Sequence, residues 1–149
     1  MPMRRFMPHR TPKAASGFRG GVGCRKMRCM AIAAMLLIGL TALLHVWFLV
    51  LEMFLWRTPF GMRTFGLTPE TAEATATLAA NQGLYNGILA AGLGWSLVAP
   101  EPTAFAFRAF FLLAVIVAGI FGGITVSRRI LLVQALPGTI ALVLTFLAA

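Results

Sequence analysis

The sequence predicts an all-α membrane protein with four transmembrane helices in an antiparallel up-down bundle. Hydrophobic residues make up 59% of the chain and charged residues only 11%, with no aspartate, whereas a soluble domain carries about a quarter charged residues. The chain also contains four apolar stretches long enough to cross about 30 Å of hydrocarbon. Helices are expected because lipid offers no hydrogen-bond partner for open backbone groups.

The expected spans form one membrane domain, residues 30–149, and are separated by polar or proline-containing joints. Thr68 is placed to cap the second helix, with Pro69 and Glu70 in its first turn. Short joints after the second and third spans make neighbouring spans antiparallel and adjacent. The spans are expected at about residues 30–55, 76–98, 105–126 and 130–147.

Residues 1–29 are expected to be a disordered basic tail. Residues 1–28 hold eight of the thirteen lysines and arginines and no acid. Counting these charges puts both termini in the cytoplasm, on the inner side of a bacterial inner membrane. If translation instead starts at Met27 or Met30, the charge balance and the orientation invert. No aromatic-interleaved basic face accompanies these charges, so nucleic acid is not an expected partner.

Small residues recur at four-residue steps in two of the expected spans. Such stripes let helix backbones approach closely in a membrane. We therefore expect the second and third spans to form the tightest pair, with the second span central. The stripes comprise Ala79, Gly83, Gly87 and Ala91 in the second span, and Gly119 and Gly123 among others in the third.

Polar side chains interrupt these apolar spans and are the main candidates for a binding site. His45 and Glu52 lie on one face of the first span, because they are seven residues apart. Polar groups in hydrocarbon are costly and often functional, but Asn and Gln also hydrogen-bond simply to hold helices together. Pro137 predicts a kink in the fourth span, repaired by Thr139. The expected cluster is His45, Glu52, Asn81, Gln82, Tyr85, Asn86 and Gln134.

Catalytic and metal-binding motifs are absent from the sequence, so no enzyme activity, cofactor or metal is expected. Cys24 and Cys29 are the only cysteines, and two thiols without other ligands are too few for a metal site.

Several short strings occur in a fixed order through the apolar body. With these strings the chain resembles, from about residue 31 to 147, domain of unknown function 1304, a family of small bacterial membrane proteins. The resemblance implies four spans and no established activity. Leu44 departs from it, because many members carry an acid there, and residues 1–28 look like an extension. The strings are LEMFLW at 51–56, TP at 58–59, FGLT at 65–68, ANQGLYNG at 80–87, VAG at 117–119, TVS at 125–127, and Gln134 with Pro137.

Two functions are open on the sequence alone. The preferred one is a membrane protein that binds or passes a small solute with proton linkage, with Glu52 as the titrating group and the carboxamides as a hydrogen-bonding wall. The alternative is a structural or partner subunit of a membrane complex, whose polar groups join helices and whose loop at residues 57–68 docks another protein. Besides the lipid bilayer, the expected partner is a second copy of the chain or another membrane protein.

Overall fold

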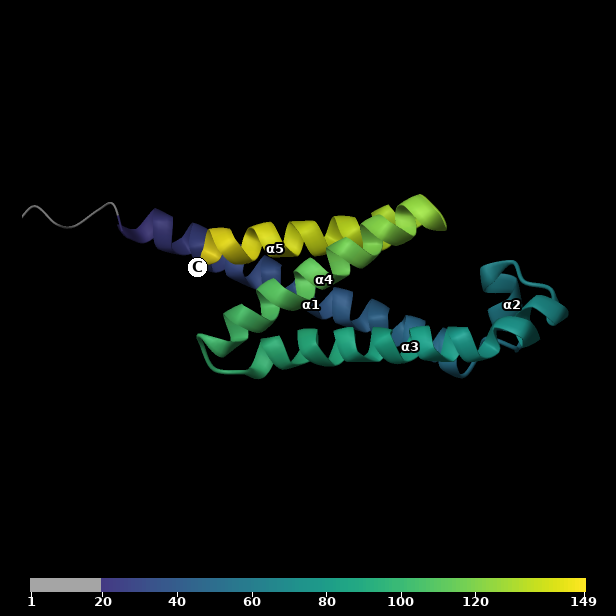
Figure 1. Ribbon diagram of the computed structural model, residues 1–149. Helices are drawn as coiled ribbons and strands as arrows, with labels where there is room; N and C mark the ends of the chain where they lie inside the picture. Colours follow the sequence, from purple (N-terminus) through teal and green to yellow (C-terminus); the bar gives the residue numbers. More distant parts are fainter. Residues whose placement is uncertain (1–19) are drawn as a thin grey trace, which may run out of the picture.

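The computed structural model describes residues 20–149, and within this range every secondary-structure element is a helix. The predicted all-α class is confirmed. Figure 1 shows successive long helices running back and forth along the long axis of the molecule. The elements are α1 (Gly20–Met53), α2 (Pro59–Phe65), α3 (Pro69–Val98), α4 (Thr103–Thr125), the π-helix η1 (Leu131–Ala135) and α5 (Leu136–Ala148).

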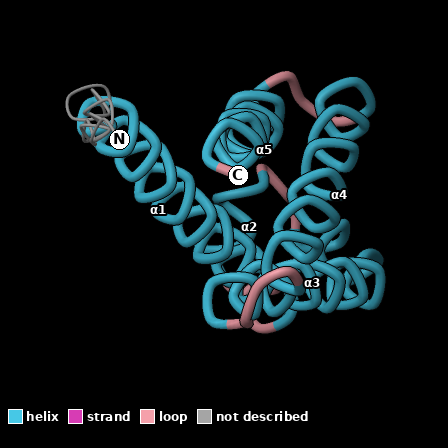
Figure 2. Tube along the Cα trace, turned by 90° about the vertical axis from the view of Figure 1, so that its left-hand side faces the viewer, coloured by secondary structure: helices cyan, strands magenta, loops and turns pink. Residues whose placement is uncertain are grey.

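The long helices are arranged so that each packs mainly against two others. Helix α1 lies between α3 and α5, and α4 lies between the same two helices on the other side. Seen along the molecule, the amino-terminal half of α1 leads away from α4 and α5 (Figure 2). The expected central position of the second span is wrong, because α3 packs mainly against α1 and α4.

Three of the described helical segments are long and apolar enough to cross a membrane: Gly23–Met53, Thr103–Thr125 and Leu131–Ala148. Helix α3, which contains the expected second span, has the length but is not among them. Its carboxamides and threonines make it more polar than the other three.

Helix α1 begins ten residues before the expected start of the first span. Residues 20–29 of the expected disordered tail are helical, because the segment contains no proline and its arginines, lysine and methionine favour helix. Residues 1–19 of that tail lie outside the described residues.

A small apolar core joins all four long helices. Its fully buried members are Ile38 of α1, Leu93 of α3, Leu112 and Val115 of α4, and Ala141 of α5. Small buried residues elsewhere let the backbones approach, so close packing rather than polar bonding accounts for most of the contact between helices.

The glycine stripes lie at helix contacts, but the expected pairing of the second and third spans through them is wrong. A Cβ atom added to Gly83 would lie 2.7 Å from Cγ of Met53 on α1. One added to Gly119 of α4 would lie 2.8 Å from the backbone nitrogen of Ala135 in η1. Gly87 likewise faces α1, and Gly123 faces η1. Of the two alanines in the stripe of α3, Ala79 is buried and Ala91 is exposed.

The fourth span contains a π-helix immediately before Pro137. The backbone N–H of Leu136 donates to the carbonyl of Leu131, five residues back. Proline has no N–H to offer the carbonyl of Val133, and a widened turn is one way for a helix to accommodate such a missing bond. The hydroxyl of Thr139 donates to the carbonyl of Ala135, at 2.8 Å.

Candidate functional site

One face of α1 carries a line of polar side chains through the interior of the molecule. Thr41 and His45 are each 1% exposed. The hydroxyl of Thr41 donates to the carbonyl of Leu37 at 2.7 Å, and Nδ1 of His45 donates to the carbonyl of Thr41 at 2.8 Å. Both groups are thus satisfied largely within their own helix.

Gln134 of η1 reaches the other ring nitrogen of His45. With Nδ1 donating to Thr41, a neutral imidazole accepts at Nε2, and Nε2 of Gln134 lies 3.4 Å from it. Because Gln134 belongs to the π-helix, the widened turn contributes to the contact between the first and last membrane-length helices. Single-turn π segments are frequent at functional sites.

A second polar pair joins α1 to α3. Nδ2 of Asn86, a buried residue, donates to Oε2 of Glu52 at 2.7 Å. The carboxyl group of Glu52 is half-buried, and among the described residues only its Oε2 accepts a hydrogen bond from a side chain. The remaining oxygen is available to a proton or a ligand.

Contacts between helices place Glu52 level with the turn that joins α4 to η1. His45 lies opposite Gln134, which follows Arg129 by five residues. Because α1 and α5 run in opposite directions (Figure 1), the step from His45 to Glu52 leads back toward that turn. Seven residues of helix rise about 10 Å, so Glu52 lies near the level of Arg128 and Arg129.

The seven predicted polar residues do not form one cluster, and the expectation is corrected to two separate pairs. His45 meets Gln134, and Glu52 meets Asn86. On α3, Asn86 shares the inward face with Gly83 and Ala79, whereas the three other polar residues fall on the outward face because a helix turns about 100° per residue. These exposed residues are Asn81, Gln82 and Tyr85.

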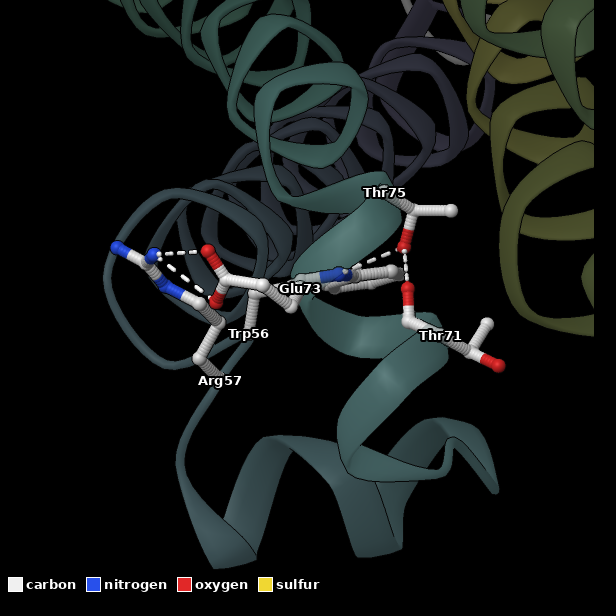
Figure 3. A network of polar contacts seen from close by, with 5 residues as sticks. All are labelled: Trp56, Arg57, Thr71, Glu73 and Thr75. Carbon is white, nitrogen blue, oxygen red and sulfur yellow. Dashed lines mark hydrogen bonds and ion pairs between the residues drawn. The ribbon is translucent and has the colours of Figure 1, made fainter.

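A joint of polar contacts between α1 and α3, which the sequence suggested only as a loop, lies beyond these pairs (Figure 3). Nε1 of Trp56 donates to the hydroxyl of Thr75 at 3.1 Å, and that hydroxyl donates to the carbonyl of Thr71. Arg57 forms an ion pair with Glu73 at 3.1 Å. Both bonds tie the segment that follows α1 to the first turns of α3.

Helix α2 is built into this joint by its caps. Thr58 accepts a hydrogen bond from the N–H of Gly61, and Pro59 follows it in the first turn. Gly66 ends the helix with φ +67°, a left-handed conformation that favours glycine. The signal was present in the sequence as Thr-Pro before the helix and Gly after it.

The start of α3 is capped in the predicted way. Thr68 accepts a hydrogen bond from the N–H of Thr71, at 3.2 Å. Hydrogen bonds from the N–H of Glu70 itself and from Thr68 hold the pKa of the Glu70 carboxyl below its usual range. This carboxylate is therefore ionised near the positive end of the helix.

A second network, missed by the sequence analysis, lies at the opposite end of the molecule. Arg108 donates from Nη2 to Oε1 of Glu101 at 2.6 Å and from Nε to the carbonyl of Ser96 at 3.2 Å. No signal for it is present in the sequence, because Glu101 lies before α4 and its spacing to Arg108 exceeds the three or four residues that bring helix side chains together. Within residues 20–149, no group of three potential metal ligands is present.

The Glu52–Asn86 bond is expected to stabilise the packing of α1 on α3. In a double-mutant cycle of Asn86→Leu and Glu52→Leu, each of which removes one partner of the bond, we expect a coupling energy of about 1–2 kcal/mol, because the bond joins a buried carboxamide to a half-buried carboxyl oxygen. The measurement is the unfolding free energy in detergent, followed by circular dichroism. A coupling below about 0.5 kcal/mol would show that the two side chains act independently.

Fold and site together define a small helical protein with membrane-length apolar helices and two internal polar pairs. The chain belongs to the family described as "Protein of unknown function (DUF1304)", whose model matches residues 39–146. It is similar to the uncharacterized protein YpaA of Lactococcus lactis, with 29% identity over 119 residues, covering 78% of this chain and 99% of the relative. No solved structure matches the chain.

Proposed function

We propose that this is a four-span integral membrane protein and a non-catalytic partner subunit, which binds a second membrane protein through its projecting α2 end. The fourth span in this proposal is α3. Helix α3 follows α1 from the approach of Leu97 to Gly39 as far as the bond of Thr75 to Trp56. These contacts cover about 21 Å of α1, from Gly39 to its end at Met53, so a membrane that contains α1 contains α3 beside it.

The end that bears α2 projects from this membrane region. Cβ of Glu52 approaches Gly83, so Gly83 marks the level of the arginine turn on α3. Helix α3 begins fourteen residues earlier, at Pro69, which corresponds to about 21 Å of helix. Arginines mark the membrane–water boundary, so these extra turns extend into the headgroup region and beyond.

This placement explains why α3 carries exposed polar residues, and it does not require a water-filled interior. Asn81 and Gln82 lie at the boundary and are exposed, where headgroups and water satisfy carboxamides. Tyr85, one turn deeper and also exposed, has the position of an interfacial aromatic residue.

The observation that carries the proposal is the set of contacts that hold the projecting end together. The bond of Trp56 to Thr75 joins the segment after α1 to α3, Trp56 lies against Phe65 with ring centroids 4.7 Å apart, and α2 is capped at both ends. The ion pair of Arg57 with Glu73 is exposed and adds little. A preformed surface loses little freedom on binding. It also exposes Phe60 and Arg63, three residues apart on α2, and aromatic residues and arginine are enriched at protein interfaces.

Site-specific photo-crosslinking tests the proposal in native membranes. A benzophenone side chain at Thr64, exposed on α2, is expected to give a discrete protein adduct that the further change Arg63→Glu removes. The same probe at Val117, exposed on α4, serves as the lipid-facing control. The mass of the adduct distinguishes a second copy from another protein. Lipid adducts alone at both positions would contradict the proposal.

A second function, proton-linked solute binding at Glu52, is favoured by the free oxygen of its half-buried carboxyl group. The variant Glu52→Gln, which keeps the shape of the side chain and an acceptor for Asn86 but removes titration, addresses it. If glutamine is neutral or stabilising at every pH, the carboxylate is retained at a cost to the fold, which is typical of working sites. A marked loss of stability favours the structural role instead.

The proposed location is a bacterial inner membrane with both termini in the cytoplasm. The basic residues before the first span support it, as does the placement of α2 on the opposite side with fewer positive charges.

A further inference from the structure

A cavity of about 440 Å³ lies between the diverging amino-terminal half of α1, the start of α4 and the end of α5. This volume is within the range of small-molecule sites. Figure 2 shows why it forms: α1 leads away from α4 and α5 toward its amino terminus. The cavity is at the opposite end of the molecule from α2, and it is distinct from both polar pairs.

The walls of the cavity are apolar except at one end. Ala31, Ala34 and Ile38 of α1 face Phe105 of α4 across it. Thr145 also lines it, but its hydroxyl donates to the carbonyl of Ala141 at 2.8 Å. This surface is compatible with a hydrocarbon chain, which would gain packing contacts against the apolar walls.

The polar end of the cavity is formed by Arg108 and Glu101. Glu101 uses both oxygens, one on Arg108 and the other on the N–H of Phe105. Arg108 uses Nε and Nη2, and its Nη1 has no hydrogen bond to any described residue although its side chain is only 14% exposed. A guanidinium has five N–H donors. The N–H groups on Nη1 of Arg108 can therefore donate to an acidic oxygen of a ligand.

The charges around this end favour an anion. Glu101 is neutralised by Arg108 and by the start of α4. Arg25, Lys26 and Arg28 are exposed on α1 close to Ala31, and basic residues beside a membrane attract anionic lipids.

We infer that this cavity binds one anionic amphiphile, with its chain between α1 and Phe105 and its acidic headgroup on Nη1 of Arg108. The shared chemistry is an acyl chain that carries a phosphate or a carboxylate. Its source is either an anionic phospholipid or a free fatty acid. This site does not depend on the function proposed for the α2 end.

Native mass spectrometry of the full chain in detergent tests the inference, with phosphatidylglycerol, phosphatidylcholine and oleate as probes. We expect one bound phosphatidylglycerol or oleate per chain, at least tenfold tighter than phosphatidylcholine. Preferential binding of phosphatidylglycerol assigns a phospholipid, and preferential binding of oleate assigns a fatty acid. Equal binding of phosphatidylcholine would overturn the anionic site.

Two variants locate the binding. Ala31→Phe fills the cavity without touching Arg108, and it is expected to weaken binding at least tenfold; Leu36→Phe, on an exposed position of the same helix, is the matched control and should bind as the native chain does. Arg108→Gln should weaken binding to a similar extent. Unchanged binding by a folded Ala31→Phe protein would overturn the site even if Arg108→Gln fails to fold.

Discussion

Alanine at position 61 is expected to detach α2 from the end of α1 and to cost about 3 kcal/mol of unfolding free energy. A Cβ atom at this position would overlap the carbonyl oxygen of Leu55 and lie 2.7 Å from its carbonyl carbon. Both atoms belong to the backbone and cannot rotate away as a side chain does. The only relief is a separation of the two segments, which also strains the bond of Trp56 to Thr75.

Limited proteolysis and tryptophan fluorescence check this expectation in detergent. Trypsin should cleave Gly61→Ala protein after Arg57 or Arg63 much faster than native protein, because both exposed arginines lie beside the disturbed contact. Thr64→Ala, on the exposed side of the same helix, should change stability by no more than about 0.5 kcal/mol. Native-like resistance of Gly61→Ala would show that the joint is looser than the structure indicates.

Gly92→Ala is expected to destabilise the packing of α3 on α4 by about 2 kcal/mol. The added Cβ atom would fall on the ring of Phe111, which contacts the core and stacks near Phe107 and Phe110. The ring has to leave its place, so the core shared by all four long helices is disturbed. Thermal unfolding in detergent is the measurement.

The chain offers a matched control two residues further along α3. A Cβ atom on Gly94 meets nothing within 4 Å, so Gly94→Ala should be neutral or should stabilise by up to about 1 kcal/mol through helix propensity. Adding Phe111→Leu to Gly92→Ala should restore part of the loss. If Gly92→Ala and Gly94→Ala behaved alike, the close contact of Gly92 with Phe111 would be refuted.

The helical class and the approximate positions of the four long helices were predictable because long apolar runs and cap residues are local signals. The start of α3 followed from Thr68 and Pro69, and the end of α4 from the polar turn after Thr125. The early start of α1 and the short helix α2 were not predicted. The helices that pack against the glycine stripes were not predictable. Glycines such as Gly83 and Gly119 indicate that another helix approaches closely, but they do not indicate which one. Which helix approaches is decided by the packing of the whole set.

The candidate site was predictable only in part for a related reason. His45, Glu52, Asn86 and Gln134 were singled out as polar residues in apolar segments, and the structure pairs them. Asn81, Gln82 and Tyr85 were assigned to the same cluster because the outward side of α3 cannot be recognised without its neighbours. The only sequence signal for the π-helix that contains Gln134 is Pro137, which predicts a kink but not a π-helix.

The bond of His45 to Gln134 joins residues 89 positions apart, and it sets an order of events during synthesis. Residue 45 is synthesised long before residue 134, so the imidazole has no Gln134 partner until η1 has been made. A chain that stops before residue 131 retains the contacts of α1 with α3 but lacks those of α1 with α5. The interior around His45 therefore closes only after η1 and α5 have been added.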